Sequence, residues 1–319
     1  MSAVSTTVPY ERGLHEVADG VFAWLQPDGG WGWSNAGLVR GEGGSLLVDT
    51  LFDLALTRAM LEAMAPITST DPIQTLVNTH ANGDHCYGNQ LVTGAEVIAS
   101  AASAAEMEAL PPSTLSTMTS LDLGDAANAY VKDAFGPFYF DDIDPPHPDR
   151  TFAGTLSVEV AGESVELVEV GPAHTAGDVL VHVPGRSTVF TGDILFIGGT
   201  PLIWDGPVQN WLDACDRILA FDADVIVPGH GPLTDAAGVR ATADYLRFVR
   251  DEATARHAAG LSATEAAWDI DLGPYADWGE SERIAQNVDA VYREIDDTYE
   301  SAGVLANFVL MGEIKLARG

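Results

Sequence analysis

The sequence of 319 residues predicts an α/β fold with a C-terminal helical extension. Short apolar runs rich in β-branched residues, such as 73–78, have the length and composition of buried strands. Residues 54–65, which precede that run, carry apolar side chains at helical spacing, and the helical period also dominates after the last predicted strand. We therefore expect an α/β domain over residues 1–235 and helices over 236–319. No linker separates the two parts, so the extension should pack on the same domain.

The composition narrows the classes of function. Apolar residues make up 46% of the chain, which is enough for a sizeable core. The formal net charge of −32, from 47 acidic and 15 basic residues, argues against a nucleic-acid partner, because binding to phosphates depends on Lys and Arg. Cys86 and Cys215, the two cysteines of the chain, provide neither a disulfide framework nor a thiolate zinc cluster.

The sequence also predicts where the protein resides. Residues 1–10 lack the basic start and the apolar core of a signal peptide, and no segment has the long uncharged apolar run that spans a bilayer. We therefore expect a soluble cytoplasmic protein with no membrane partner.

The first elements are predicted to be strands, followed by a β-α-β unit. Residues 17–25 have the pattern of a strand, a turn and a strand, and 36–40 and 45–50 that of a hairpin. The helical spacing of 54–65 then predicts a crossover helix that leads to the strand at 73–78.

Two features of this region have open interpretations. The glycine-rich loop 27–35 contains Trp31 and Trp33, which form either a flap that contacts substrate or a pair packed on the edge of the sheet. Asp49 closes an apolar strand, where a carboxylate either orients a neighbouring metal ligand or caps the following helix.

The most informative stretch follows the predicted strand at 73–78. Within six positions it contains His80, Asn82, Asp84 and His85. Imidazole nitrogen and carboxylate oxygen are the donors that borderline divalent cations prefer, and a turn lets closely spaced side chains converge. The stretch therefore predicts a metal site; the alternative is a polar surface turn.

Further strands and helices are predicted in the middle of the chain. Residues 95–100 and 101–110 have the patterns of a strand and a helix, and 156–160 and 164–170 alternate as strands do. The segment 113–150 has a weaker signal but is rich in aromatic residues and prolines. It forms either a wall of a substrate pocket or a helical lid whose aromatic side chains pack on the body.

Three later polar turns border apolar strands and carry His174, Asp193 and His230. When separate strand ends supply such residues, the economical inference is that they meet at one edge of the sheet. Beyond these turns, 235–259 and 281–301 are predicted helices. Ser281 is the expected N-cap of the second of these helices.

These motifs, taken in order, resemble those of the metallo-β-lactamase superfamily across roughly the first 235 residues. The resemblance implies an αββα sandwich with a metal pair, usually zinc, between two β-sheets. It also implies that Asp49 matches the family's first motif. The metal ligands that it implies are His80, Asp84, His85, His174, Asp193 and His230.

The sequence departs from the family pattern at Asn82, where the family normally has its second histidine. A carboxamide oxygen is a weaker donor to zinc than imidazole is. We therefore expect two ions with unequal occupancy, or a harder ion such as manganese or iron. Asn82 is then either a weak ligand or a group that hydrogen-bonds substrate or water.

The expected chemistry is hydrolysis. A bound divalent cation lowers the pKa of water from about 15.7 toward about 7 and polarises a carbonyl under attack. Asp84 is placed to orient that water or accept its proton. Tyr87, or the loop with Trp31 and Trp33, is a candidate for stabilising an oxyanion or holding an acyl chain, although a packed Tyr87 is the favoured alternative.

A second resemblance concerns the substrate. The Asn82 variant, the Cys-Tyr-Gly-Asn run after it and the Trp-Gly-Trp loop are similar to the metallo-β-lactamase-like cyclase/thioesterases of aromatic polyketide biosynthesis, a setting of antibiotic production. This resemblance implies an acyl-carrier-protein thioester as substrate, aldol ring closure and hydrolytic release. The alternatives are a glyoxalase II-like thioesterase or lactonase, and a non-catalytic binding protein with a degraded metal site. The oligomeric state stays open, a homodimer included.

Overall fold

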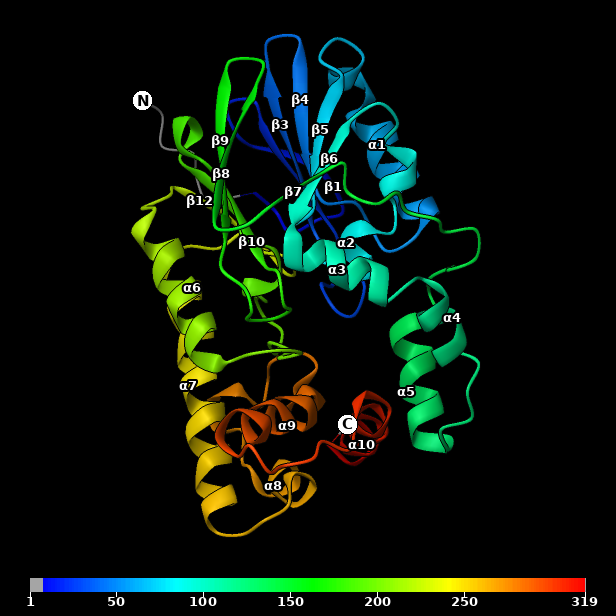
Figure 1. Ribbon diagram of the computed structural model, residues 1–319, viewed down its shortest axis with the longest axis vertical. Coiled ribbons are helices and arrows are strands. Elements are labelled where there is room, and N and C mark those ends of the chain that lie inside the picture. The colour runs from blue at the N-terminus through cyan, green and yellow to red at the C-terminus, as the bar shows by residue number, and fades with distance from the viewer. Residues whose placement is uncertain (1–7, 319) are drawn as a thin grey trace.

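The computed structural model describes residues 8–318 of the chain and contains two β-sheets that pack face to face (Figure 1). The prediction that residues 1–10 are not a signal peptide falls mostly on residues 1–7, which lie outside the described residues. The seven-stranded sheet has the order β1-β2-β3-β4-β5-β6-β7, and the five-stranded sheet has the order β12-β11-β10-β9-β8. The strands are β1 Gly13–Ala18, β2 Val21–Leu25, β3 Ala36–Gly41, β4 Gly44–Val48, β5 Ile73–Val77, β6 Glu96–Ser100, β7 Arg150–Phe152, β8 Thr155–Val160, β9 Glu163–Glu169, β10 Val179–Val183, β11 Thr188–Phe190 and β12 Val225–Val227.

The first sheet changes from antiparallel to parallel at β4. Strands β1 to β4 form antiparallel pairs, as the two predicted hairpins require. Strands β4, β5, β6 and β7 are parallel, and helix α1 (Leu54–Thr68) connects β4 to β5, which confirms the predicted β-α-β unit. Parallel strands end at the same edge, so the turns that follow β4 and β5 are neighbours.

Alternation along the strands builds the layers of the sandwich. Leu46 and Val48 of β4 face the second sheet, where they join a core cluster that contains Val179 and Val181 of β10. Leu47, between them, packs with helix α1 on the opposite face. On the outer face of the second sheet, Leu180 shares a cluster with helix α6 (Val208–Ala220). This arrangement confirms the αββα sandwich that the resemblance implied.

The remaining helices are α2 Gly83–Cys86, α3 Ala101–Ala109, α4 Ser113–Met118, α5 Asp125–Phe135, α7 Ala236–Ala258, α8 Ala263–Asp269, α9 Ile284–Ile295 and α10 Val304–Arg318. Most of them form the lower part of Figure 1, whereas α2 and α3 lie at mid-height, close to the strands of the sandwich. The C-terminal helix α10 packs on α5, and α7 packs on both α6 and α9. The helical extension is therefore joined to the sandwich through shared apolar clusters.

The predicted helix at 281–301 is only partly correct. Ser281 does not cap an α-helix, because it lies in a short 3₁₀ turn (Ser281–Arg283) and its side chain makes no capping hydrogen bond. The helix itself is α9, which begins after Arg283 and ends at Ile295. The apolar spacing located the helix, whereas Ser281 already lies inside the 3₁₀ turn, because the chain enters that turn at Glu280, which has a left-handed backbone conformation (φ +59°).

The segment 113–150 combines both predicted roles. The segment contains two helices, α4 and α5, at the right of Figure 1, and α5 packs against α10. Phe138 and Phe140 pack around Phe52, with ring centroids 4.8 and 4.9 Å away. Phe135, in contrast, lines a cavity. Among residues 8–318, none of the helices combines the length and apolarity needed to cross a membrane.

Candidate metal centre

The turn that follows β5 supplies four of the predicted site residues. His80 and Asn82 lie between β5 and the short helix α2, which contains Asp84 and His85. His80 and His85 are fully buried, while Asp84 keeps about a tenth of its side chain, 13%, exposed.

The second sheet supplies the other three residues. His174 lies in the loop between β9 and β10, Asp193 follows β11, and His230 follows β12. Each of them is buried. The structure thus brings all the predicted ligands to one edge of the sandwich, although 150 residues separate His80 from His230 (230 − 80).

Asp193 stands at the centre of this group. One of its oxygens, Oδ2, lies 3.7 Å from His80 Nε2, 3.4 Å from His174 Nε2 and 3.4 Å from His230 Nε2. The other, Oδ1, lies 3.1 Å from His85 Nε2. His230 Nε2 is also 3.2 Å from Asp84 Oδ2. A single carboxylate therefore faces all four imidazoles.

The chemistry of these atoms fits a divalent cation. Two trios, His80, His85 and Asp193, and Asp84, His85 and His230, each place their donor atoms within 4.8 Å of one another. His80 Nε2, His85 Nε2 and Asp193 Oδ1 are buried and have no hydrogen-bond partner. Because an unpaired buried polar atom costs about 1–3 kcal/mol, such a group of atoms is expected where a cation completes the site.

The second ring nitrogen of every imidazole is fixed by a neighbour. His85 Nδ1 lies 2.8 Å from Asp49 Oδ2, and His80 Nδ1 lies 3.0 Å from Thr79 Oγ1. Two others point to backbone carbonyl oxygens, His174 Nδ1 at 2.6 Å and His230 Nδ1 at 3.0 Å. A carbonyl oxygen only accepts, so in these two rings Nδ1 carries a proton and Nε2 is the nitrogen that faces the centre.

These contacts decide between the two interpretations of Asp49. Its carboxylate accepts hydrogen bonds from Thr79 N and Thr79 Oγ1, both at 2.7 Å, and contacts His85. The cap of helix α1 is instead Asp53, whose side chain accepts from Leu56 N. Asp49 therefore orients a candidate metal ligand.

Burial and neighbouring charge set the protonation of the imidazoles. Burial lowers the pKa of His80 well below its ordinary value and that of His174 to about 4. For His85, burial acts in the same direction, but the carboxylates of Asp193 and Asp49 outweigh it and raise the pKa. Burial also lowers the pKa of His230, but the carboxylates of Asp193 and Asp84 outweigh it and raise the pKa to about 9. Because metal ligation needs the neutral ring, a cation that binds here must displace protons from His85 and His230.

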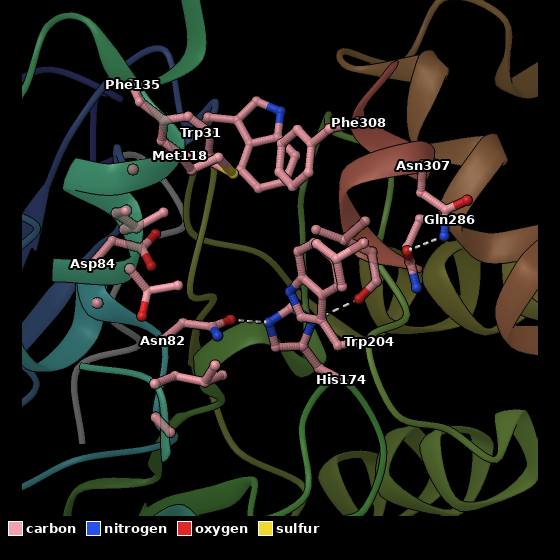
Figure 2. A pocket seen from close by; sticks show the side chains of 18 of the residues that line it. Trp31, Asn82, Asp84, Met118, Phe135, His174, Trp204, Gln286, Asn307 and Phe308 are labelled. Atoms are coloured by element: carbon pink, nitrogen blue, oxygen red, sulfur yellow. Dashed lines mark hydrogen bonds between the residues drawn. The ribbon is translucent and has the colours of Figure 1, made fainter. Parts of the chain in front are cut away.

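Asn82 makes an unusual contact with His174. Its Oδ1 lies 2.8 Å from His174 Nε2, which carries no proton because the proton is on Nδ1 and burial keeps the ring neutral (Figure 2). Two lone pairs at this separation repel. The contact is stable when a cation binds both atoms, or when the amide is turned so that its NH₂ group donates to Nε2.

Two glycines let the strand ends approach. A Cβ atom on Gly229 would meet Asp193 Oδ1, and one on Gly192, where φ is +50°, would meet the Thr79 side chain at 2.6 Å. The Thr-Gly-Asp and Pro-Gly-His turns therefore need glycine so that Asp193 and His230 can reach the other ligands.

A cavity of about 850 Å³ opens beside the centre. Asn82, Asp84, Tyr87 and Trp31 line it, and Figure 2 shows Trp31 with other apolar side chains on one side of Asp84 and His174. Trp33 is not part of this lining and packs on Phe138, with ring centroids 4.8 Å apart. Of the two predicted substrate contacts, Trp31 is the one in position; a role for Tyr87 stays a prediction.

Sequence reasoning missed a link between the centre and the helical extension. Glu280 Oε1 accepts a hydrogen bond of 2.7 Å from the backbone N–H of Trp31, and the carbonyl oxygen of Gly29, two residues earlier, contacts His230. Glu280 is held by Arg283, whose guanidinium lies between Trp31 and Phe196, 4.5 and 5.2 Å from their ring centroids. No local pattern signals this link, since 249 residues separate Trp31 from Glu280.

The comparisons with known proteins identify the family. Residues 29–230 match the family model described as the metallo-beta-lactamase superfamily, more than half of the chain. The chain belongs to the metallo-beta-lactamase superfamily. Members of this family bind divalent metals, and the clusters described above are the groups of side chains in this chain that could hold such ions. Which metal they hold stays a prediction.

The relatives of this chain have names that refer to different reactions. The chain is 25% identical over 229 residues to the 2,4-dinitroanisole O-demethylase subunit alpha of Nocardioides sp. (strain JS1661), covering 70% of this chain and 57% of the relative. It is 23% identical over 270 residues to the linear primary-alkylsulfatase of Pseudomonas sp. (strain ATCC 19151), covering 75% and 50%. The hydroxyacylglutathione hydrolase of Rhizobium meliloti (strain 1021) is 29% identical over 106 residues, covering 32% and 41%. The chain thus spans about half the length of the curated relatives it matches.

Solved structures agree on the fold. The sec-alkylsulfatase Pisa1 from Pseudomonas sp. superposes with a TM-score of 0.69 at 17% identity, covering 90% of this chain and 51% of that chain. A metallo-beta-lactamase from Pontibacter korlensis superposes with a TM-score of 0.57 at 21% identity, covering 74% of this chain and 99% of its own. At these identities the likeness shows the fold alone.

The Asn82 contact leads to a prediction about metal content. After dialysis against a weak chelator, the wild-type protein should retain about one ion per chain, because Asp84, His85, His230 and Asp193 form a complete donor set and the Asn82 side does not. Asn82→His should raise the content to about two ions. Elemental analysis measures both, with Gln90→His, a nearby imidazole outside the site, as control. Two equally retained ions in the wild type contradict this interpretation.

The link through Glu280 leads to a second prediction. Glu280→Ala removes the acceptor of Trp31 N–H and loosens the carbonyl that orients His230, so metal affinity in chelator competition should fall about ten-fold. Glu280→Gln retains an acceptor and should stay within about three-fold of wild type. Asp289→Ala serves as the control. Like Glu280, Asp289 is a buried carboxylate in the extension that pairs with an arginine, in this case Arg293. An equal loss in Glu280→Ala and Asp289→Ala would show that only general stability is affected.

Proposed function

We propose that this chain is a metal-dependent hydrolase that cleaves a neutral thioester or related ester with a bulky apolar acyl group. The observation that carries the proposal is the position of the cavity: it opens directly on the metal-binding residues, and most of its wall is apolar or aromatic. Trp31, Phe135, Trp204 and Phe308 are part of this wall. Such a wall suits an apolar group held next to a reacting bond.

The charges of the cavity favour a neutral substrate. Among the described residues, the lysines and arginines in the lining are Arg283 and Arg293. Arg283 is bound by Glu280 and Arg293 by Asp289, so both cationic groups are already neutralised. An anionic ester such as an alkyl sulfate would therefore meet no unpaired arginine side chain among the described residues that line the cavity.

Several residues have defined tasks in the proposed reaction. A bound divalent cation would polarise the acyl carbonyl and lower the pKa of the attacking water toward about 7. Asp84 lies on the cavity side of the centre, where it can accept a proton from that water. Burial raises the pKa of Tyr87, so its hydroxyl stays protonated and can donate a hydrogen bond to an oxyanion.

The relatives support hydrolysis more than any one substrate. One of them is named a hydroxyacylglutathione hydrolase, which favours acyl transfer to water, and two others are named for a sulfate ester and an aryl ether. The non-catalytic alternative is less attractive, because the buried donor atoms without hydrogen-bond partners are intact.

A second candidate is cyclisation of a poly-β-keto acyl thioester before its release. The aromatic side chains that surround the cavity favour it, because flat rings stack on a folding polyketide chain. In that case the acyl group would arrive on an acyl carrier protein. The two candidates share the metal centre and differ in the product.

A substrate panel tests the proposal. A naphthoyl thioester of N-acetylcysteamine should be hydrolysed with a kcat/KM at least about 100-fold above that for naphthyl sulfate, and Asp84→Asn should lower the thioesterase rate about 10²- to 10⁴-fold. Thiol release and sulfate release are measured on the same metal-loaded sample. Faster sulfate release, or thioester hydrolysis that persists after chelation, would contradict the proposal.

The same assay separates the two candidates. A poly-β-keto thioester, supplied free and on a carrier protein, should give the linear acid if the chain only hydrolyses. A cyclic product that forms only with active protein would favour the cyclase.

A further inference from the structure

The helical extension builds one side of the cavity. The family match ends at residue 230, and the solved metallo-beta-lactamase from Pontibacter korlensis covers 74% of this chain. Beyond residue 230, helices α9 and α10 and the loop between them contribute side chains to the lining. These include Gln286, Asp289, Val304, Leu305, Asn307 and Phe308.

The mouth of this cavity is unusually apolar. Leu110, Leu121, Val304 and Leu305 line it, and their exposed fractions are 55%, 41%, 52% and 45%. They are half of the eight large apolar side chains that are exposed among residues 8–318. Exposed apolar side chains that gather at a single opening, instead of being scattered, mark a binding surface. We call these four residues the apolar lip.

The lip comes from three segments that are distant in sequence. Leu110 follows α3, Leu121 lies between α4 and α5, and Val304 and Leu305 form the first turn of α10. The three segments line the same cavity, and α10 packs on α5, the helix that follows Leu121. One side of the lip therefore belongs to the sandwich domain and the other to the extension.

Apolar side chains continue from the lip to the metal centre. Behind the lip, Met118 and Phe308 are buried to 8% and 3% exposure and line the cavity. Figure 2 shows both beside Trp31 and Phe135, on the side of the cavity away from Asn82. The rings of Trp31 and Phe308 are 5.7 Å apart.

The polar groups along this wall are already engaged. Trp31 Nε1 donates to the Tyr130 hydroxyl at 2.9 Å, and the Asn307 amide donates to Gln286 at 2.8 Å. A ligand that lies along the wall thus meets few unpaired polar groups. An unbranched or flat apolar group suits it, whereas a charged one does not.

We propose that the cavity and the apolar lip together bind a long apolar tail of the substrate, and that the first turn of α10 selects for its length. This inference rests on the proposed function, which places the acyl carbonyl at the metal centre. The tail then extends past Met118 and Phe308 and leaves between Leu121 and Leu305. The extension, which lies outside the family match, determines substrate specificity in this way.

A chain-length series tests this inference. The substrates are the butanoyl, octanoyl and dodecanoyl thioesters of N-acetylcysteamine, assayed by thiol release below their micelle concentrations. For wild type, kcat/KM should rise by up to about four-fold for each added methylene that becomes buried. The double variant Val304→Ser, Leu305→Ser should lower the ratio of dodecanoyl to butanoyl kcat/KM about ten-fold.

Leu316→Ser is the matched control, because Leu316 is a 75% exposed leucine on the same helix and is not part of the cavity lining. It should leave the ratio within about two-fold of wild type. The inference would be overturned by a wild-type kcat/KM that does not change with tail length. It would also be overturned by an equal change of the ratio in the lip variant and in the control.

A binding measurement separates this inference from the proposed function. The probe is S-dodecyl-N-acetylcysteamine, a thioether that cannot be hydrolysed, and the readout is quenching of tryptophan fluorescence in the metal-loaded protein. Affinity should be at least about 100-fold higher for the dodecyl than for the butyl probe in wild type, and the lip variant should bind the dodecyl probe about ten-fold more weakly than wild type does. If the probe binds in this way but no thioester is cleaved, the proposed reaction fails and the tail site stands. If neither probe length nor lip substitution affects binding, the tail site fails.

Discussion

The structure depends on the convergence of four imidazoles on the carboxylate of Asp193. Each imidazole approaches Asp193 to within 3.7 Å or less, and the atoms that face the centre are buried. Such a cluster is costly without a cation, because buried lone pairs and a buried carboxylate lack partners. The strands, the two glycine turns and the contacts to Nδ1 are all arranged so that these atoms face one point. The fold can therefore be understood as a scaffold that holds a divalent ion between its two sheets.

The helical extension belongs to this scaffold. Glu280 holds the backbone of the Trp31 loop, and that loop orients His230 through the carbonyl of Gly29. The same extension supplies Phe308 and the first turn of α10 to the cavity. One segment thus supports a candidate metal ligand and lines the cavity beside it, so our proposal assigns substrate specificity to a part of the chain outside the family match.

The sequence predicted those features that are encoded locally. Strand ends followed by His, Asp and Gly marked the candidate ligands, and short apolar runs marked the strands, because each signal lies within about ten residues. The sandwich itself was implied by the resemblance to the family. The role of Asp49 stayed open until the structure showed Thr79 and His85 around its carboxylate. Ser281 was wrong as a helix cap because the chain enters the turn one residue earlier, at Glu280, whose left-handed conformation carries no signal in the local sequence pattern. Contacts between residues such as Trp31 and Glu280 had no local signature and required the fold.

The central claim is that these side chains share a divalent cation, and diffraction above and below a metal absorption edge tests it most directly. Crystals grown from metal-replete protein should show an anomalous peak among Asp193, His85 and His230, and a weaker peak on the side of Asn82 and His174. An absence of anomalous signal at this cluster under the same conditions, with the side chains arranged as described, would contradict the account.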